Sequence, residues 1–393
     1  MFEIRGRHNT AVVYAQRTDQ ESVSQVLALC NTPYLADSRI RMMPDMHASE
    51  GCTVGTSLTI HGKANPAWVG GDIGCGMQVY RLEETELDFA KLDDVIRSEI
   101  PSGAAIFPTE NKAVRALPLE KLICYLYLRH KTVICSLGTL GGGNHFIEVD
   151  RDTDGALYLV IHSGSRRLGR DVAMYWQNEA FCLRNGFDPK ELARHRVDVS
   201  AAKMRKDECY LEGEELSGYL HDMEIAVAYA LRSRELMGEA IISAMNLHPD
   251  HAFATIHNYI DVKHGVLRKG AVSAQVGEEL IIPINMRDGS LLCQGRGNPE
   301  WNCTAPHGAG RMLTRSQAKS EISIEEYRAA MEGIYTTSVS ESTLDESPMA
   351  YRGIEEILDE IEPTAEVTGL LAPVYNFKAS KAAVEEETMD GKD

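Results

Sequence analysis

Hydrophobic and polar residues recur along the chain with two different periods, and each period predicts a different kind of element. Short apolar and β-branched runs are typical of strands, and they predict strands at Ala11–Tyr14, Ser57–Ile60, Thr132–Cys135, His145–Val149, Leu157–His162 and Leu280–Pro283. Spacing of three and four residues is typical of helices, and it predicts helices at Ser22–Leu29, Phe89–Ser98, Ser217–Met245, Ser323–Met331 and Gly353–Ile361.

The longest predicted helix runs from about Ser217 to Met245 and carries an apolar stripe. Seven of its residues fall on one face at helical spacing, namely Met223, Ala226, Val227, Ala230, Met237, Ile241 and Met245. Such a stripe is typical of core packing rather than of a binding surface.

The order of the predicted elements favours an α+β fold with mixed or antiparallel sheets flanked by helices. Strands and helices do not alternate in the regular way that a doubly wound sheet requires. The sequence contains no internal repeat and no Pro- or Ser-rich linker. We therefore expect a single large domain over residues 1–380, followed by an acidic tail over residues 381–393.

The composition, 44% hydrophobic and 25% charged residues in a chain of 393, is ordinary for a soluble globular protein. No apolar run reaches the roughly 18 residues of a membrane helix, and Met1–Arg5 does not begin a secretory signal. We expect a cytoplasmic protein without a membrane partner.

The nine scattered cysteines are odd in number and form no Cys-x-x-Cys pair. This pattern argues against a disulfide framework or a zinc knuckle, and it leaves room for one or two functional thiolates among the cysteines.

The net charge of −18 argues against non-specific binding to nucleic acid, because phosphate affinity comes from clustered cations. Local clusters remain compatible with a specific site. One consists of Arg166, Arg167 and Arg170, and another consists of Arg311, Arg315 and Lys319.

A glycine-flanked segment, Asp72–Met77, places a carboxylate and a thiol three residues apart at Asp72 and Cys75. The two groups can reach one metal ion or two neighbouring ions, and cysteine with imidazole suits zinc, iron or manganese. The same spacing also fits a tight turn with a buried cysteine. His145, His162 and His257, each at a predicted strand edge or in a short Gly or Asn context, would complete a metal site.

Three further segments suit phosphate chemistry. Gly138–Gly143 offers a run of backbone N–H groups that can cradle an anion, although it lacks the lysine of a P-loop. Ser163–Arg167 adds hydroxyls and guanidinium groups. His307–Arg311 places a histidine beside two glycines and an arginine, and a histidine can carry a transferred group covalently.

These motifs, taken together, resemble the RtcB family of RNA-splicing ligases in order and over nearly the whole chain. The resemblance rests on Met43–His47, Asp72–Met77, Leu137–Glu148, His162–Arg166, His257–Asn258, Arg268–Ala271, His307–Arg311 and Asp345–Tyr351. It implies an RtcB-like fold. It also implies an RNA ligase that acts in RNA splicing and repair and uses GTP and two Mn²⁺ ions. Such a ligase joins an RNA 3′-phosphate or 2′,3′-cyclic phosphate to a 5′-hydroxyl through a guanylyl-histidine.

The resemblance also implies roles for single residues. His307 resembles the histidine that takes GMP, and Cys75 resembles a thiolate shared by two metal ions. Asp72 and His145 would complete the protein ligands of one ion, and His162 and His257 those of the other. The guanylate would be bound by Asn144, His145, Phe146, Ile147, Glu148, His257, Asn258, Gly308, Ala309, Gly310 and Lys378. Arg166 resembles a phosphate contact.

One segment departs from the family pattern. Pro283, Ile284, Asn285 and Met286 stand where the family has a Pro-Gly-Ser-Met stretch that contacts the nucleotide. A glycine and a hydroxyl are therefore replaced by Ile284 and Asn285, while Ser290 occupies a position where the family offers a contact. This departure predicts altered nucleotide handling.

Two other functions stay open on the sequence. A metal-dependent phosphoesterase acting on RNA ends would need the metal ligands but no nucleotide carrier. A non-catalytic module that binds GTP or RNA would need neither. The physiological RNA, the oligomeric state and the need for an archease-type activator are also left open by the sequence.

Overall fold

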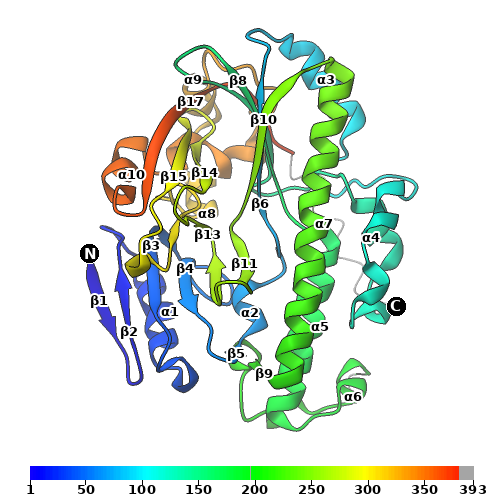
Figure 1. Ribbon diagram of the computed structural model, residues 1–393, viewed down its shortest axis with the longest axis vertical. Helices are drawn as coiled ribbons and strands as arrows, with labels where there is room; N and C mark the ends of the chain where they lie inside the picture. The colour runs from blue at the N-terminus through cyan, green and yellow to red at the C-terminus, as the bar shows by residue number, and fades with distance from the viewer. Residues whose placement is uncertain (195, 380–393) are drawn as a thin grey trace.

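Two large sheets organise the computed structural model, which describes residues 1–194 and 196–379 (Figure 1). The first sheet has the order β1-β2-β3-β4-β12-β11, and the second has the order β10-β6-β8-β7-β17-β15-β14. Within them β2 and β3 pair in parallel, and the other described strand pairs are antiparallel. The predicted α+β class with mixed sheets is therefore confirmed.

The strands are short apart from β17. Those of the first sheet are β1 (Phe2–Arg5), β2 (Thr10–Val13), β3 (Ile40–His47), β4 (Val54–Thr59), β12 (Val266–Lys269) and β11 (Asn258–Asp261). Those of the second are β10 (Pro249–Ile256), β6 (Gly76–Leu82), β8 (Leu157–Ser163), β7 (Phe146–Arg151), β17 (Ala365–Phe377), β15 (Gly289–Gly295) and β14 (Glu279–Asn285). Two smaller pairs are β5 (Lys63–Ala64) with β9 (Leu211–Glu212), and β13 (Ala271–Ser273) with β16 (Thr304–Pro306).

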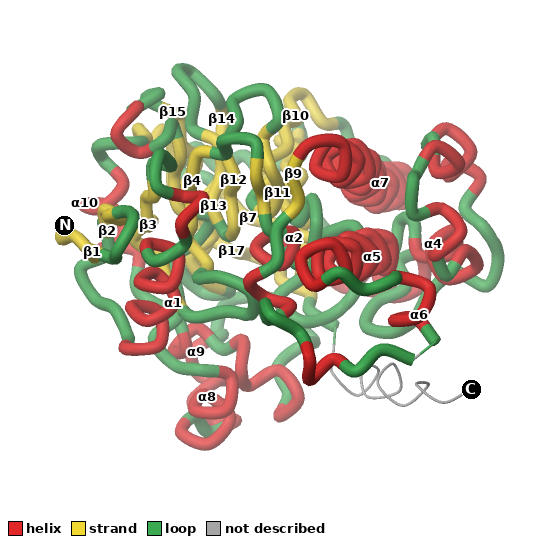
Figure 2. The backbone as a smooth tube through the Cα atoms, turned by 90° about the horizontal axis from the view of Figure 1, so that it is seen from below, coloured by secondary structure: helices red, strands yellow, loops and turns green. Residues whose placement is uncertain are grey.

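The helices lie outside the sheets. They are α1 (Gln20–Cys30), α2 (Pro66–Val69), α3 (Phe89–Glu99), α4 (His130–Ser136), α5 (Arg166–Asn185), α6 (Pro189–Ala193), α7 (Gly213–Met245), α8 (Arg315–Glu321), α9 (Ile324–Ala330) and α10 (Ile354–Ile361). Figure 2, which looks along α5 and α7, shows these two long helices side by side on one flank of the strands.

Helix α7 begins and ends where its sequence favours it. Glu214 and Glu215 lie in the first turn, where acidic groups complement the helix dipole. Asn246 ends the helix in the left-handed conformation that asparagine tolerates well. The predicted apolar stripe is confirmed as core packing. Met223 and Ala226 are buried in the core that α7 shares with α5, and Met237 packs against the second sheet.

Most of the predicted elements are present, but one prediction was wrong. The predicted strand at Thr132–Cys135 is part of helix α4, and its Val133 packs in the core shared with α5. A four-residue apolar run does not separate a buried strand from a buried helix turn, so tertiary packing decides. Helix α5 was not predicted, because its many polar residues conceal the spacing of Leu168, Val172 and Trp176.

The nine cysteines are all free thiols. No helix in the described residues is both long enough and apolar enough to cross a bilayer. The predicted acidic tail, residues 381–393, lies outside the described residues.

Candidate metal centre and adjoining pocket

The ends of four adjacent strands bring the predicted metal ligands together. Strands β10, β6, β8 and β7 are consecutive and antiparallel, so β6 and β7 start at the edge of the sheet where β8 and β10 end. Cys75 precedes β6 and His145 precedes β7, while His162 is the penultimate residue of β8 and His257 follows β10. Residues 182 positions apart in sequence therefore meet at one edge because of the strand order.

The side chains at this edge are within contact of one another. The Cys75 Sγ atom lies 3.2 Å from His162 Nε2 and 3.6 Å from His145 Nε2. The Nε2 atoms of His162 and His257 are 3.2 Å apart. Asp72 Oδ2 lies 3.5 Å from His145 Nε2.

These five residues form two groups that share one thiol. Cys75, His162 and His257 form the first group, and Asp72, Cys75 and His145 form the second; within each, the ligand atoms lie within 4.8 Å of one another. Thiolate, imidazole and carboxylate together suit a transition metal such as zinc, iron or manganese. The arrangement is compatible with a metal cofactor, and Cys75, to which the resemblance gives a shared role, belongs to both groups.

Main-chain carbonyl groups orient two of the imidazoles. His145 donates from Nδ1 to the Leu140 carbonyl oxygen at 2.9 Å, and His162 donates from Nδ1 to the Asn144 carbonyl oxygen at 3.1 Å. These bonds leave each Nε2 unprotonated and facing the cluster, which is how protein hydrogen bonds usually select a ligand tautomer. The buried Nδ1 of His257 has no partner among the described residues.

Burial keeps the imidazole rings of His162 and His257 neutral, which is the form that binds a metal ion. Burial, and next the neighbouring His145 ring, lowers the pKa of His162 well below its usual value. Burial and the His307 ring do the same to the pKa of His257. Burial and the Asp72 carboxylate raise the pKa of the Cys75 thiol, whereas a bound metal ion deprotonates a coordinating thiol outright.

A buried arginine holds the two loops that carry Cys75 and His162. Arg234 of α7 is completely buried and donates from one terminal nitrogen to the carbonyl oxygens of Gly74 and Ser163, at 2.8 and 2.7 Å. Gly164 packs against Asp72 so closely that a Cβ atom there would lie 2.0 Å from the carboxylate. Arg234 and Gly164 therefore hold the loops that carry the metal-type ligands in place.

His307 stands next to this cluster. It follows β16, and its ring centroid lies 4.8 Å from that of His257. Its Nδ1 donates to Asp45 Oδ2 at 2.7 Å, and its backbone N–H donates to the same oxygen at 3.1 Å. The Asp45 side chain is completely buried. The bond to Nδ1 leaves Nε2 with a free lone pair, as a nucleophile requires.

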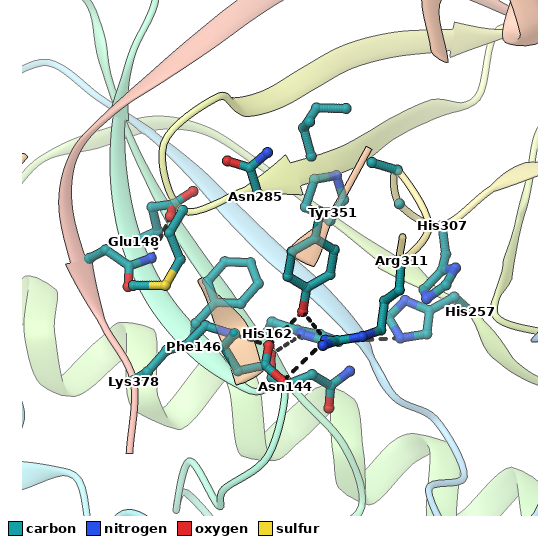
Figure 3. Close-up of a pocket in the computed structure, with 18 of the residues that line it drawn as sticks. Asn144, Phe146, Glu148, His162, His257, Asn285, His307, Arg311, Tyr351 and Lys378 are labelled. Carbon is teal, nitrogen blue, oxygen red and sulfur yellow. Dashed lines mark hydrogen bonds and ion pairs between the residues drawn. The ribbon is translucent and has the colours of Figure 1, made fainter. Parts of the chain in front are cut away.

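A pocket opens from the His257 and His307 end of the cluster (Figure 3). The figure shows His257 and His307 at one end, and Glu148 and Lys378 at the other. Its predicted lining residues are Asn144, Phe146, Glu148, His257, Pro283, Ile284, Asn285, Met286, His307, Gly308, Ala309, Gly310 and Lys378. His47, His162, Arg311, Arg315, Glu346, Tyr351 and Asn376 also line it.

A charged network forms one wall of the pocket. Glu346, almost fully buried, accepts from Lys378 Nζ at 2.8 Å and from the Tyr351 hydroxyl at 2.6 Å, and it pairs with Arg315. Arg311 donates to the Tyr351 hydroxyl at 2.8 Å. Burial opposes ionisation of Glu346, but Lys378 and Arg315 outweigh it and hold the pKa of the carboxyl well below its usual value.

Glu148 forms the floor at the far end of the pocket. It lies on β7, two residues beyond Phe146, and is almost fully buried. The Asn376 side chain on the neighbouring strand β17 donates to its carboxylate. Burial raises the pKa of the Glu148 carboxyl.

A larger cleft of about 960 Å³ adjoins the same histidines. Asn144, His257 and His307 line both the cleft and the pocket. The cleft also contains Asp72 and Cys75, together with five cations: Arg166, Arg167, Arg170, Lys206 and Lys269. The clustered basic residues recognised in the sequence at 166–170 thus lie on the approach to the metal ligands.

The family profile described as "tRNA-splicing ligase RtcB" matches residues 25–124 and 127–379. The chain belongs to the RtcB family. It is 29% identical over 398 residues to the RNA-splicing ligase RtcB of Escherichia coli strain K12, covering 92% of this chain and 94% of the relative. It is 26% identical to the RNA-splicing ligase RtcB of Mycobacterium tuberculosis (81% and 91% covered) and to the tRNA-splicing ligase RtcB of Aeropyrum pernix (80% and 82% covered).

Four residues that the RtcB resemblance assigned to the nucleotide do not line the pocket, and one of them, His145, lies in the metal-ligand cluster. Ile147 is completely buried on the opposite face of β7, because side chains alternate along a strand. Ser290 is completely buried in β15. Asn258 lines the cleft, and its amide donates to the carbonyl oxygens of Val69 and Asp72 at 2.9 and 2.8 Å.

The hairpin that departs from the RtcB pattern has its own internal bonding. The Asn285 side chain accepts from the backbone N–H groups of Arg287 and Asp288 and donates to the Asp288 carboxylate at 2.8 Å. Ile284 is 2% exposed and packs with Ala309 in an apolar cluster. Ile284 and Asn285 therefore both stabilise the β14–β15 hairpin and its packing.

Sequence reasoning missed several residues of the site. Asp45 belongs to a motif that was recognised but given no role. Arg234 could have been found, because it interrupts the apolar stripe of α7 between Ala230 and Met237. Asn376 has no sequence signal of its own, since only the pairing of β17 with β7 brings it to Glu148.

Proposed function

We propose that this protein is a GTP- and manganese-dependent RNA ligase that joins an RNA 3′-phosphate or 2′,3′-cyclic phosphate end to a 5′-hydroxyl end. The observation that carries the proposal is the place of His307. It lies between a pocket that can hold a nucleotide and a basic cleft that can hold RNA, beside a cluster of metal-type ligands. A histidine in this position can take a nucleotidyl group from a nucleotide in the pocket and transfer it to RNA in the cleft.

The metal ligands fit two divalent cations. Asp72, Cys75 and His145 would hold one, and Cys75, His162 and His257 the other, as the two ligand groups suggest. The mixed thiolate, imidazole and carboxylate set suits Mn²⁺ among the metals that accept such ligands. When bound, the ions supply positive charge that stabilises the phosphoryl groups in transfer.

His307 would be the residue that carries GMP. Asp45 holds its Nδ1 hydrogen, so Nε2 is free to attack the α-phosphorus of GTP. The N–P bond forms as the bond from the α-phosphorus to the leaving pyrophosphate breaks. Asp45 also stabilises the positive charge that develops on the ring, as a carboxylate does behind a catalytic imidazole.

The pocket residues would hold the nucleotide that supplies GMP. The Glu148 carboxylate can accept from the N1–H and amino group of guanine at the far end of the pocket. Arg311, Arg315 and Lys378 offer cationic donors along the wall. The other predicted contacts, Asn144, Phe146, Pro283–Met286 and Gly308–Gly310, form the remaining walls.

The cleft would bind RNA. Its five cations suit phosphate oxygens despite the acidic balance of the whole chain. The printed names of the relatives, RNA-splicing and tRNA-splicing ligases, support RNA as the substrate. After hydrolysis of any cyclic phosphate, the RNA 3′-phosphate would take GMP from His307, and attack of the 5′-hydroxyl would form the phosphodiester and release GMP.

A ligation assay tests this proposal directly. RNA fragments with 2′,3′-cyclic phosphate and 5′-hydroxyl ends are incubated with the protein, GTP and Mn²⁺, with and without an archease-type activator. We expect joined RNA that depends on both GTP and Mn²⁺. Opening of the cyclic phosphate without joining under any of these conditions would instead indicate a phosphoesterase, and binding without reaction would indicate a non-catalytic module.

Two variants separate the carrier from the metal ligands. His307→Ala should retain Mn²⁺ and should still seal an RNA whose 3′-phosphate already carries GMP, because that step needs no carrier. Its ligation of ordinary ends should fall by about 10⁶-fold, the usual cost of removing a covalent nucleophile. Cys75→Ala should fail on both RNAs. If His307→Ala also fails on the pre-activated RNA, His307 is not a dedicated carrier.

A further inference from the structure

Asp150 is a buried acidic residue that the proposed reaction does not use. It follows Glu148 by two residues on β7, so both side chains project from the same face of the strand. Its side chain is completely buried, and neither carboxyl oxygen accepts a hydrogen bond from an N–H or O–H group in the described residues. Such a group is expensive to keep as an anion.

Within the described residues, the only side chain that acts on the Asp150 carboxyl is that of Glu148, another carboxyl two residues away on the same face of β7. Two carboxylates cannot hydrogen-bond to each other, because an ionised carboxylate only accepts; one of the pair must carry a proton. Burial raises the pKa of both groups, and the neighbouring Glu148 raises the pKa of Asp150 further, whereas the contact with Asp150 lowers the pKa of Glu148.

The surroundings decide which carboxyl keeps the proton. Glu148 receives a hydrogen bond from Asn376, and Lys378 lowers the pKa of its carboxyl, so its anion is stabilised. Asp150 has neither a donor nor a cation beside it among the described groups. Its cross-strand neighbours are Tyr158 on β8 and Pro373 on β17.

The charged and titratable groups around the pair come from three elements. These are Lys378 at the end of β17, Glu346 in the short helix Glu341–Glu346, and Tyr158 on β8. Glu346 pairs with Lys378. Lys378 is therefore the group through which the network acts on Glu148.

We propose that Asp150 is a protonated acid that donates a hydrogen bond to Glu148 and thereby keeps Glu148 an anion that selects guanine. The inference rests on the proposed function, since it requires a purine nucleotide in the pocket. Guanine presents N–H donors at N1 and at its 2-amino group, whereas adenine has an acceptor at N1 and no 2-amino group. An anionic Glu148 accepts from guanine and repels the N1 lone pair of adenine, so Asp150 is a positioning residue for base selection.

Two substitutions of similar size separate this role from simple packing. Asp150→Asn keeps a neutral donor facing Glu148, and Asp150→Leu removes the donor. The measured quantities are the KM for GTP and for ATP in labelling of the protein by the nucleotide, from pH 6 to pH 9. We expect Asp150→Leu to raise the KM for GTP and to reduce the preference for GTP over ATP by about tenfold each, the effect of losing a hydrogen bond to a charged group.

The pH profile gives a readout that packing alone would not change. A donor to the ionised form lowers the pKa of Glu148, so removing the donor raises it. Asp150→Leu should then lose GTP affinity at a higher pH on the acid side than the wild type. Asp150→Asn should keep both the wild-type acid limb and the GTP preference within about twofold, because its amide replaces the acid as donor.

An infrared measurement keeps the proposal testable if Asp150→Leu does not fold. The wild-type protein should show the C=O stretch of a buried protonated carboxylic acid at neutral pH, and Asp150→Asn should lack it. Absence of this band from the wild type, equal damage by both substitutions, or an unchanged GTP preference in Asp150→Leu would each overturn the inference. Failure of the wild type to be labelled by any nucleotide would instead overturn the proposed function.

Discussion

The metal centre and the pocket beside it are held in place by different kinds of contact. At the metal centre, main-chain carbonyl groups orient His145 and His162, and Arg234 holds the loops by bonding to carbonyl oxygens. In the pocket, buried carboxyl side chains hold their partners. Asp45 binds His307, and Glu346 binds Lys378 and Arg315.

This difference has consequences for sensitivity to pH and to mutation. A histidine oriented by a carbonyl group depends on the backbone, which few side-chain substitutions move. A network of buried charges depends on every member, because removal of one leaves its partner buried without compensation. We therefore expect the metal centre to tolerate changes in neighbouring side chains other than Arg234, and the pocket to be damaged by single charge-neutralising substitutions.

The largest effect expected in the pocket is that of Asp45→Asn. The amide can donate to Nδ1 of His307, which moves the ring hydrogen to Nε2 and removes the nucleophilic lone pair. Formation of the GMP adduct should fall by about 10²- to 10⁴-fold, as when a catalytic imidazole is held in the wrong tautomer. Mn²⁺ content should be unchanged. Loss of metal together with activity would show that Asp45 supports the metal centre instead.

A smaller effect is expected on stability from Glu346→Gln. The folded protein holds the pKa of Glu346 below its unfolded value, so the ionised carboxylate stabilises the fold above about pH 4.3. This stabilisation is lost as the pH falls below that value toward the lower folded pKa. At pH 7 we expect Glu346→Gln to reduce the free energy of unfolding by about 2 kcal/mol, less than for a fully buried pair because Arg315 is 45% exposed.

Denaturant unfolding at several pH values checks this expectation. The difference between Glu346→Gln and wild type should shrink as the pH falls below about 4. The matched control is Glu3→Gln, which removes the exposed pair of Glu3 with Arg5 and should change stability by less than about 1 kcal/mol. A Glu346→Gln variant as stable as the control would show that the network does not hold the pocket together.

The smallest effect is expected from Asn285→Ser in the departing hairpin. Serine keeps an acceptor for the turn and restores the hydroxyl that the RtcB pattern has there. We expect the GTP concentration needed for guanylylation to fall by about twofold to threefold, the size of a weak added hydrogen bond. Ile284→Gly is a poorer test, because it would empty a packed position in the core. No change in GTP dependence would place this hairpin away from the nucleotide.

Much of the fold could be predicted from hydrophobic patterning alone, since long helices with an apolar stripe such as α7 and continuous apolar strands such as β8 carry strong local signals. The short run at Thr132–Cys135 was misassigned because only its packing against α5 decides between helix and strand. The polar composition of α5 hid its helical spacing. Strand order carries no local signal, so the convergence of β10, β6, β8 and β7 needed the structure.

The candidate site shows the same limit. Motifs identified the residues to which the proposal gives the chemistry, including Cys75, His162 and His307, because each lies in a short and distinctive sequence. The residues that position them come from distant elements. Arg234 and Asn376 reach the site only through helix packing and strand pairing, and alternation along β7 turns Ile147 away from the pocket.

The central claim is that His307 becomes covalently bonded to GMP, and locating that bond tests it most directly. The wild-type protein is incubated with Mn²⁺ and GTP labelled at the α-phosphorus, then digested at a pH that preserves phosphoramidates, and the labelled peptide is sequenced by mass spectrometry. The account predicts one GMP per chain on His307, lost on mild acid treatment, and none in His307→Ala. GMP on another residue such as Lys378, or no adduct under conditions in which the protein joins RNA, would contradict it.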